Sequence, residues 1–551
     1  MNKKRLVLGI VLGLATVLLK AQTPMESVIL GGELSNSAAT SVADIDEVMP
    51  RMAALGLNTV LVPAAWEFVE PEEGRFDFEL VDRVVQKARE NQLHVVFLWF
   101  GAWKNSMSCY APLWFKKDTK RFPRARTAQG KPLEIATPFS ENVLRADLRA
   151  FTKLMEHLAA IDKGTGTVVM MQIENEIGML ESARDHSPQA EAVYRQGVPK
   201  ELAAFLEKEK LHPWLAARFN AKGNTWTEVF GDDIYTDEIF MAYYYAKYVE
   251  ALAQAARKTY DMPLYVNAAM NSRGRKPGEY PSAGPLAHLI DLWHAGAPSI
   301  DLLAPDIYDT GFKGWAAQYA LHNNRLFIPE SRCCENSGVR ALYAFGEYRA
   351  LGFSPFAIDQ AGSKETESVT KAYGLMRQVA NLPAYRKADG TVWGLLFDQQ
   401  DKERVVSDGG TVMTARHYFT LPWDARATDG NVWPEGGALL VKLDKNEYLL
   451  AGSGVVVEFK TQSEKAQEEK KVLGEDGFVD NGASGNNAPS VLPKWKGSRL
   501  GIGSVDEVTI DENGHFGYLR RHNGDQDHQG RHVRIGVGEW KILHVRLYEY
   551  E

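Results

Sequence analysis

The sequence is poor in cysteine and lacks the short motifs that mark metal and nucleotide sites. It has 3 cysteines in 551 residues, too few for a disulfide scaffold. It contains no Cys-x-x-Cys or His-Glu-x-x-His spacing, no Walker loop, no Gly-x-Gly-x-x-Gly after a strand and no Gly-x-Ser-x-Gly elbow. We therefore expect that the protein uses no metal and no cofactor.

An excess of basic residues is also missing. The chain has 63 Lys and Arg against 71 Asp and Glu, a formal net charge of -8. Because a surface with this net charge repels nucleic acid, we do not expect a nucleic-acid partner.

The apolar run at the N-terminus is too short to span a membrane. Leu6 to Leu19 is 14 residues long, whereas a span needs about 20. Lys3, Lys4 and Arg5 precede the run, and Lys20-Ala21-Gln22 follows it, which is typical of a secretory signal peptide. We expect residues 1–22 to be removed and the mature protein to be periplasmic or secreted, without stable membrane insertion.

Short apolar runs alternate with longer amphipathic segments from about residue 27 to 359. Eight runs are nearly continuous in Val, Ile, Leu or Phe, as in parallel strands covered on both faces: Ser27 to Leu34, Thr59 to Trp66, His94 to Phe100, Val168 to Glu174, Leu264 to Ala269, Leu302 to Tyr308, Leu326 to Glu330 and Phe353 to Asp359. Helix-like spacing of apolar residues lies between them, as in Leu80 to Asn91. The pattern predicts a (β/α)8 barrel over residues 23–385.

Two other regions depart from this pattern. Met179 to Glu238 is the longest insertion between predicted strands, and we expect it to wall or cover the site. After about Tyr385 the apolar residues alternate in short runs separated by Gly, Asp and Asn, for example Val392 to Phe397 and Trp540 to Tyr550. These runs predict a C-terminal antiparallel β-sandwich over residues 386–551.

Two glutamates end predicted strands where barrel enzymes place their reactive groups. Glu176 follows Asn175 after the fourth strand, and Glu330 ends the seventh. The C-terminal strand ends form the active face of such barrels. Two carboxyl groups about 5 to 5.5 Å apart hydrolyse a glycosidic bond with retention of configuration. We therefore predict that this pair is catalytic.

The segment Gln172 to Gly178, QIENEIG, resembles the acid/base motif of glycoside hydrolase family 35, the β-galactosidases. Trp66 to Pro71, WEFVEP, and Ala111 to Trp114, APLW, are similar to the stretches after strands two and three in that family. The C-terminal part resembles the domain attached to one bacterial branch. The resemblance implies that Glu176 is the acid/base and Glu330 the nucleophile.

The resemblance also implies roles for two neighbours. Asn175 matches the residue that hydrogen-bonds the sugar 2-hydroxyl, and Tyr308 matches the tyrosine that donates to the nucleophile. Other presumed strand-end residues are candidate sugar contacts, because aromatic faces pack on apolar sugar faces and polar groups bind hydroxyls: Trp66, Trp103, Asn36, Glu67 and Asn267.

Together these features predict a retaining, exo-acting β-galactosidase that removes terminal galactose from plant-type oligosaccharides or polysaccharides. One alternative is another retaining enzyme of the same clan: a β-glucosidase, β-xylosidase, α-L-arabinosidase or galactanase. The other is a catalytically inactive carbohydrate-binding protein. A panel of nitrophenyl glycosides separates the enzymes, and any turnover excludes the inactive protein.

Overall fold

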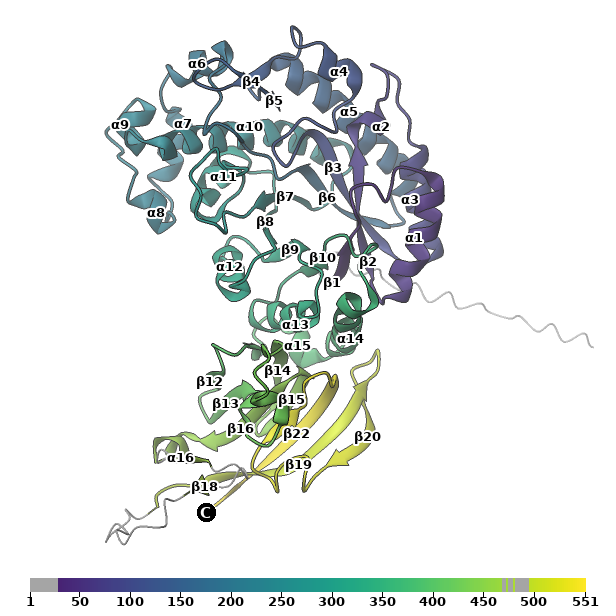
Figure 1. Ribbon diagram of the computed structural model, residues 1–551, viewed down its shortest axis with the longest axis vertical. Helices are drawn as coiled ribbons and strands as arrows, with labels where there is room; N and C mark the ends of the chain where they lie inside the picture. Colours follow the sequence, from purple (N-terminus) through teal and green to yellow (C-terminus); the bar gives the residue numbers. More distant parts are fainter. Residues whose placement is uncertain (1–27, 468–471, 474–478, 481–494) are drawn as a thin grey trace, which may run out of the picture.

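The computed structural model describes residues 28–467, 472–473, 479–480 and 495–551, so the predicted signal peptide lies outside the described residues. The described chain forms a barrel ringed by helices, with antiparallel sheets against one side of it (Figure 1). Among the described helices, none combines the length and the hydropathy that a membrane span requires.

Eight parallel strands close into a barrel in the order β1-β10-β9-β8-β7-β6-β3-β2. The strands are β1 (Ile29–Glu33), β2 (Thr59–Ala65), β3 (His94–Lys104), β6 (Val168–Asn175), β7 (Leu264–Ala269), β8 (Leu302–Ile307), β9 (Phe327–Ser331) and β10 (Gly352–Pro355). Each of the eight predicted runs overlaps one of them, which confirms the predicted barrel. A small hairpin, β4 (Arg124–Arg126) with β5 (Pro132–Ala136), lies in the loop after β3.

Helices cover the outside of the barrel because each presents an apolar stripe to it. In α3, Val81, Val84, Val85 and Ala88 are buried, the spacing of one helix face. Serines cap two of the longer helices, since Ser41 accepts from the backbone of α1 and Ser140 from that of α5. The barrel helices are α1 (Val42–Ala54), α2 (Trp66–Val69), α3 (Glu79–Glu90), α4 (Leu113–Lys117), α5 (Glu141–Asp162), α10 (Ile234–Thr259), α11 (Ile290–Gly296), α12 (Phe312–Tyr319), α13 (Ser337–Glu347), α14 (Ser363–Val379) and α15 (Pro383–Arg386).

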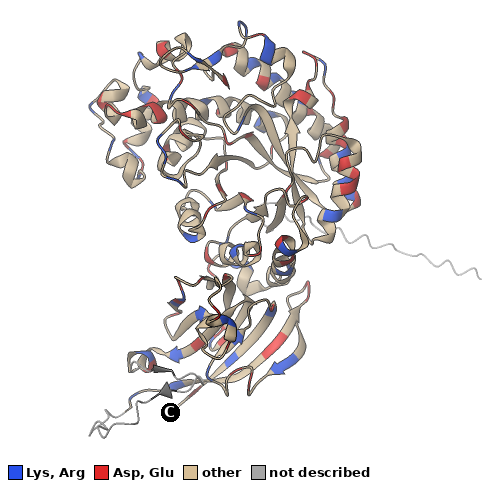
Figure 2. Ribbon diagram, in the orientation of Figure 1, with Lys and Arg blue, Asp and Glu red and all other residues tan. Residues whose placement is uncertain are grey.

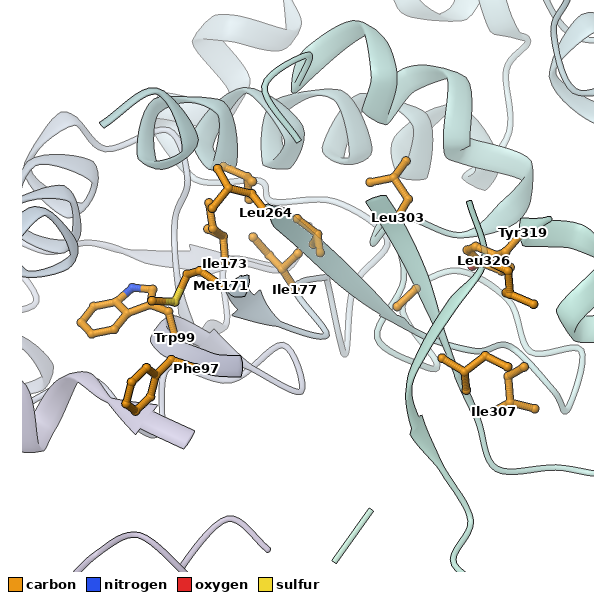
Figure 3. Packing of buried hydrophobic residues seen from close by; sticks show 14 of the residues in the cluster. Phe97, Trp99, Met171, Ile173, Ile177, Leu264, Leu303, Ile307, Tyr319 and Leu326 are labelled. Carbon is orange, nitrogen blue, oxygen red and sulfur yellow. The ribbon is translucent and has the colours of Figure 1, made fainter. Parts of the chain in front are cut away.

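The strands divide their side chains between two cores. Phe97 and Trp99 of β3 point outward and join Met171 and Ile173 of β6 in the layer between strands and helices (Figure 3). The alternate residues of β3, such as Leu98, face the barrel interior. This period of two explains why each strand is apolar along its whole length. Lys, Arg, Asp and Glu are mixed on the outer helices (Figure 2).

The long insertion after β6 is helical. It contains α6 (Pro188–Tyr194), α7 (Lys200–Leu206), α8 (Pro213–Ala216) and α9 (Trp226–Phe230). The start of the insertion bonds to the loop after β7, because Met179 and Ser282 exchange backbone hydrogen bonds of 2.7 and 3.0 Å.

The C-terminal part consists of antiparallel sheets, as predicted. One sheet has the order β11-β14-β15-β22-β19-β20 and another β12-β13-β16-β21, with a second apolar core between them. Their strands are β11 (Val392–Phe397), β12 (Glu403–Ser407), β13 (Thr411–His417), β14 (Gly436–Asp444), β15 (Glu447–Ser453), β16 (Val455–Thr461), β19 (Arg499–Ile510), β20 (Phe516–His522), β21 (Val533–Ile535) and β22 (Lys541–Tyr550). Helix α16 (Gln462–Ala466) and the pair β17 (Val472–Leu473) and β18 (Val479–Asp480) complete this part.

The six-stranded sheet packs on the barrel through α13 and α14. Leu439 and Leu449 of the sheet belong to the same apolar cluster as the barrel helices. The backbones come close where Gly346 of α13 meets Gly394 of β11, so that a Cβ on Gly346 would lie 2.8 Å from the Gly394 Cα. The two parts therefore share one continuous core.

Candidate active site

A cavity of about 400 Å³ lies at the C-terminal ends of the barrel strands. Its lining residues are Asn36, Lys104, Asn105, Glu176, Ala269, Met270, Pro281, Asp306, Tyr308, Asp309, Glu330 and Phe356. A second cavity, of about 420 Å³, is lined by residues of α1, β2, α2, α3, β3 and nearby loops and contains none of these groups. Only the first combines several buried carboxylates with a space for a ligand.

The two glutamates predicted to be catalytic lie together in this cavity. Oxygens of Glu176, Glu330 and Asp306 all lie within 4.8 Å of one another. Glu176 is 6% exposed and Glu330 3%. Paired carboxyl groups of retaining glycosidases are about 5 to 5.5 Å apart, whereas inverting pairs leave roughly 6.5 to 9.5 Å. The Glu176 and Glu330 oxygens therefore lie closer together than the carboxyl groups of inverting pairs do.

Three donors surround the Glu330 carboxylate. The Tyr308 hydroxyl donates to Oε2 at 2.6 Å, and the side-chain amides of Asn175 and Asn267 donate to Oε1 at 3.1 and 3.2 Å. Burial and the charge of Glu330 raise the pKa of Tyr308 well above its usual value, so this hydroxyl keeps its proton. Such an arrangement stabilises negative charge on Glu330.

Glu176 is in a different environment. Burial, and secondarily the charge of Glu330, raise its pKa to about 7, while Lys104 acts in the opposite direction. The Asn105 side-chain amide donates to its Oε2. Glu176 therefore holds a proton below about pH 7, as a general acid requires.

The backbone that carries Glu176 adopts a conformation uncommon for residues other than glycine. Glu174 has φ of 58° and Glu176 of 44°, in the left-handed region. Two hydrogen bonds hold the segment in place: Trp103 N–H donates to the Glu174 carboxylate at 2.8 Å, and Glu176 N–H donates to Asn267 Oδ1 at 2.9 Å. These contacts direct the Glu176 side chain into the cavity.

A tight turn over residues 104–107 binds the same segment from the side. Asn105 and Ser106 have φ of 49° and 67°, as in a type I′ turn. Their backbone N–H groups donate to the carbonyls of Asn175 and Glu176 at 3.1 and 3.2 Å. Neither this turn nor the two lining residues it presents, Lys104 and Asn105, was predicted from the sequence. The available signal was the Asn105-Ser106 pair, which follows the apolar run after Lys104.

Asp306 is the third carboxyl group of the site and was also missed. It accepts from the Asn267 amide at 2.7 Å and is 2% exposed. Burial, with the charges of Glu330 and Glu176, raises its pKa well above the usual value, so it can share a proton with Glu176. The available signal was strand alternation, because Asp306 is two residues before Tyr308 and so faces the same side.

The three carboxylates form the only grouping among the described residues whose spacing suits a metal ion. Hard cations such as Ca²⁺ bind carboxylate oxygens. Here, however, both oxygens of Glu330 already accept from amide or hydroxyl donors, and one oxygen of Asp306 does too. A cation would have to displace these donors, so the arrangement fits a hydrogen-bonded anion better than a metal ligand set.

The structure brings together six of the predicted site residues. Four line the cavity, and Asn175 and Asn267 reach it through their bonds to Glu330: Asn36, Asn175, Glu176, Asn267, Tyr308 and Glu330.

The two predicted tryptophan contacts are wrong. Trp66 is fully buried, donates to Glu70 at 2.9 Å and packs against Trp114. Trp103 is also fully buried, and it meets the Tyr248 ring edge-on. Because neither ring has an exposed face, neither can stack on a sugar.

Two further expectations are corrected by the lining of the cavity. Glu67 is not a lining residue, and its carboxylate lies 3.8 Å from the Lys116 ammonium instead. The insertion 179–238 contributes no lining residue either. The loop after β7, with Met270 and Pro281, lies there in its place.

Comparisons with known proteins concern the two parts separately. A family model described as beta-galactosidase, glycoside hydrolase family 42, matches residues 38–237. A family model described as a domain of unknown function matches residues 369–534. No curated protein sequence matches the chain.

A beta-galactosidase from the psychrophilic Marinomonas ef1 is among the similar solved structures, with 13% identity and a TM-score of 0.43. The match covers 64% of this chain and 60% of that one. A likeness this low has no bearing on function. The family match to residues 38–237 supports a glycoside hydrolase of the β-galactosidase type, although the matching family is 42 rather than 35, whose motifs the sequence resembles.

Proposed function

We propose that this protein is an exo-acting retaining β-galactosidase that releases terminal galactose from plant-type oligosaccharides or polysaccharides. One observation carries the proposal: two buried carboxyl groups lie within 4.8 Å of each other in surroundings that differ. Glu330 is surrounded by donors that stabilise its charge, while Glu176 has a pKa of about 7. Such a pair supplies a nucleophile and an acid.

In the first step, the Glu330 carboxylate attacks the anomeric carbon as the bond to the leaving oxygen breaks. Glu176 transfers its proton to that oxygen, so the aglycone departs as a neutral alcohol. The product is a glycosyl ester of Glu330. The hydrogen bonds from Tyr308 and the two asparagines hold the nucleophile in orientation until it attacks.

In the second step, Glu176 acts as a base. Forming the ester removes the negative charge of Glu330, which is one cause of the raised pKa of Glu176, so this pKa falls. Glu176 then accepts a proton from water, and the water oxygen attacks the anomeric carbon and releases Glu330. Two displacements leave the sugar with its original configuration.

The choice of galactose is supported by the family match to residues 38–237 and by the motifs that resemble family 35. The exo-action is supported by the size of the cavity, about 400 Å³, at the small end of ligand pockets. Export is supported by the N-terminal sequence pattern. The other retaining glycosidases of the clan remain the alternative, because the same pair would serve them.

The test is to measure kcat/KM on nitrophenyl β-galactoside, β-glucoside, β-xyloside and α-L-arabinoside. Proton NMR identifies the anomer that is released first. We expect the highest kcat/KM on the β-galactoside and release of the β-anomer. A β-galactan should yield galactose from the earliest times. An inverted product would contradict the retaining mechanism. A higher kcat/KM on another glycoside of the panel would contradict the assignment of galactose. Early release of longer fragments would contradict the exo-action.

A further inference from the structure

Lys104 is a buried lysine whose ammonium has no hydrogen-bond or ion-pair partner among the described residues. The residue is 5% exposed, ends β3 and lines the cavity. No residue in the described part of the chain accepts a hydrogen bond from its Nζ or forms an ion pair with it; the closest recorded contact is the face of the Phe100 ring, 5.1 Å from Nζ to the centroid. Because Lys104 lines the cavity, these donors are available to an acceptor that enters it.

Unpartnered acceptors line the same space. Asn36 Oδ1, Asn175 Oδ1 and Asp306 Oδ1 are buried and accept from no donor in the described part of the chain. A sugar hydroxyl both donates and accepts, so one ring with several hydroxyls can bind the acceptors and the ammonium at once. The ligand chemistry that suits this set is a polyhydroxylated ring.

The charges around Lys104 favour a neutral ligand. Glu33, Asp306 and Glu176 surround it, and burial raises the pKa of each, to about 7 for Glu176 and well above the usual value for the other two. The cavity lining contains one cation, Lys104, and four carboxyl groups, Glu176, Asp306, Asp309 and Glu330. An anionic sugar such as a uronic acid would add an unbalanced buried charge.

We infer that Lys104 is a substrate-binding residue that selects a neutral sugar in the first subsite by donating to one of its hydroxyl oxygens. The turn over residues 104–107 holds it there through its hydrogen bonds to Asn175 and Glu176. The inference rests on the proposed function insofar as the ligand is a glycoside, and it adds a specificity-determining group to the catalytic pair.

The test combines Lys104→Met with aryl β-galactosides that lack the hydroxyl at position 2, 3, 4 or 6. Because a hydrogen bond from a charged donor contributes about 1.5 to 3 kcal/mol, we expect Lys104→Met to lower kcat/KM by about 10- to 100-fold. In the wild type each deoxy substrate loses activity. In the Lys104→Met variant, one of the four deoxy substrates should be cleaved as well as the parent galactoside, because the hydroxyl that it lacks no longer has Lys104 as a hydrogen-bond partner.

Lys116→Met is the matched control, since Lys116 is a half-buried lysine outside the cavity that bonds the Cys109 carbonyl at 2.8 Å. It should keep the wild-type response to all four substrates. A second readout is the pH profile: Lys104 lowers the pKa of Glu176, so Lys104→Met should move the alkaline limb of kcat/KM upward. Lys104→Gln, a smaller change, replaces the methionine variant if the latter unfolds at a lower temperature than the wild type.

The inference would be overturned if the loss from Lys104→Met and the loss from the missing hydroxyl added up for all four deoxy substrates. A preference for galacturonides over galactosides would also overturn it. If the wild type prefers another glycoside, the proposed sugar is wrong and the deoxy series of that glycoside tests Lys104. If the wild type cleaves none, the proposed function fails. Calorimetric titration with free monosaccharides then tests Lys104, and equal affinities for wild type and variant would overturn the inference.

Discussion

At the scale of single residues, the proposed mechanism makes the proton on Glu176 the group that limits activity at alkaline pH. The pKa of Glu176 is raised to about 7 by burial and by the charge of Glu330, and the proposed first step uses the acid form. As pH rises through 7 the free enzyme loses this proton. We therefore expect kcat/KM for a natural disaccharide to fall above about pH 7, with a midpoint that reports this group.

An aryl galactoside with a very good leaving group is the control for this pH profile. Its aglycone departs without protonation, so its first step should depend much less on the alkaline limb. Equal alkaline limbs for the disaccharide and for the activated substrate would contradict the assignment of Glu176 as the acid.

The two glutamates should also respond differently to truncation. Glu330→Ala removes the nucleophile and should abolish turnover of every substrate. Glu176→Ala should still form the glycosyl ester from an activated substrate but hydrolyse it slowly. Azide needs no general base, so it should restore turnover by Glu176→Ala and give the β-galactosyl azide. Azide with Glu330→Ala should give the α-anomer, and NMR of the products distinguishes the two; the reverse pattern would exchange the assignments.

The site residues that could be predicted are those that lie at the end of an apolar run. Glu330 and Tyr308 end such runs, and Glu176 lies two residues after one, so the barrel places all three at one rim. Lys104 was missed because β3 runs four residues beyond its predicted end. Trp66 was predicted to contact sugar because it too ends a run, but position along a strand does not reveal whether a ring faces the cavity or the helices.

At the scale of elements, the barrel strands were predictable because they are buried on both faces, which leaves an apolar run. The C-terminal strands were harder. In β20, six of its seven residues are exposed, and its apolar residues Phe516, Tyr518 and Leu519 do not alternate regularly with polar ones, so it was not predicted. Strand β12, with three exposed residues of five, was missed for the same reason. The short helix α16 forms in a polar stretch, where Glu464 is buried and pairs with Arg499 at 2.9 Å.

The contact of helix α13 with the six-stranded sheet can be tested at one ion pair. Arg340 donates two hydrogen bonds, of 2.7 and 2.6 Å, to the Glu435 carboxylate, and the side chains are 12% and 16% exposed. Arg340→Met leaves a mostly buried carboxylate unpaired, so we expect a loss of about 2 to 4 kcal/mol in the free energy of unfolding. Urea denaturation measures it.

The double variant Arg340→Met with Glu435→Gln is the control for that pair. It removes both charges, and it should be more stable than Arg340→Met alone because no unpaired carboxylate remains. A single variant as stable as the wild type would show that the pair contributes little to the contact between the barrel and the sheet.

At the scale of the whole molecule, the shared core should make the barrel and the antiparallel sheets unfold together as one unit. Leu439, Val441, Leu449 and Ala451 of the sheet lie in the same apolar cluster as the barrel helices. Without the sheets, the faces of α13 and α14 that they cover would be exposed to water. Contiguous exposed apolar patches of several hundred Å² are uncommon on soluble proteins and promote aggregation.

We therefore predict that a chain ending at Tyr385 aggregates or unfolds at a markedly lower temperature than the full chain, although every residue that lines the catalytic cavity is retained. Thermal unfolding and size-exclusion chromatography measure both effects. A matched control is the full chain with Tyr518→Ser, because Tyr518 is 63% exposed in the same sheet and its loss should leave stability within about 0.5 kcal/mol of the wild type. If the truncated chain were soluble, monodisperse and fully active, the sheets would be a separate module with a role of their own. The loss expected here instead makes them a structural support for the helices behind β9 and β10, the strands that carry and adjoin Glu330.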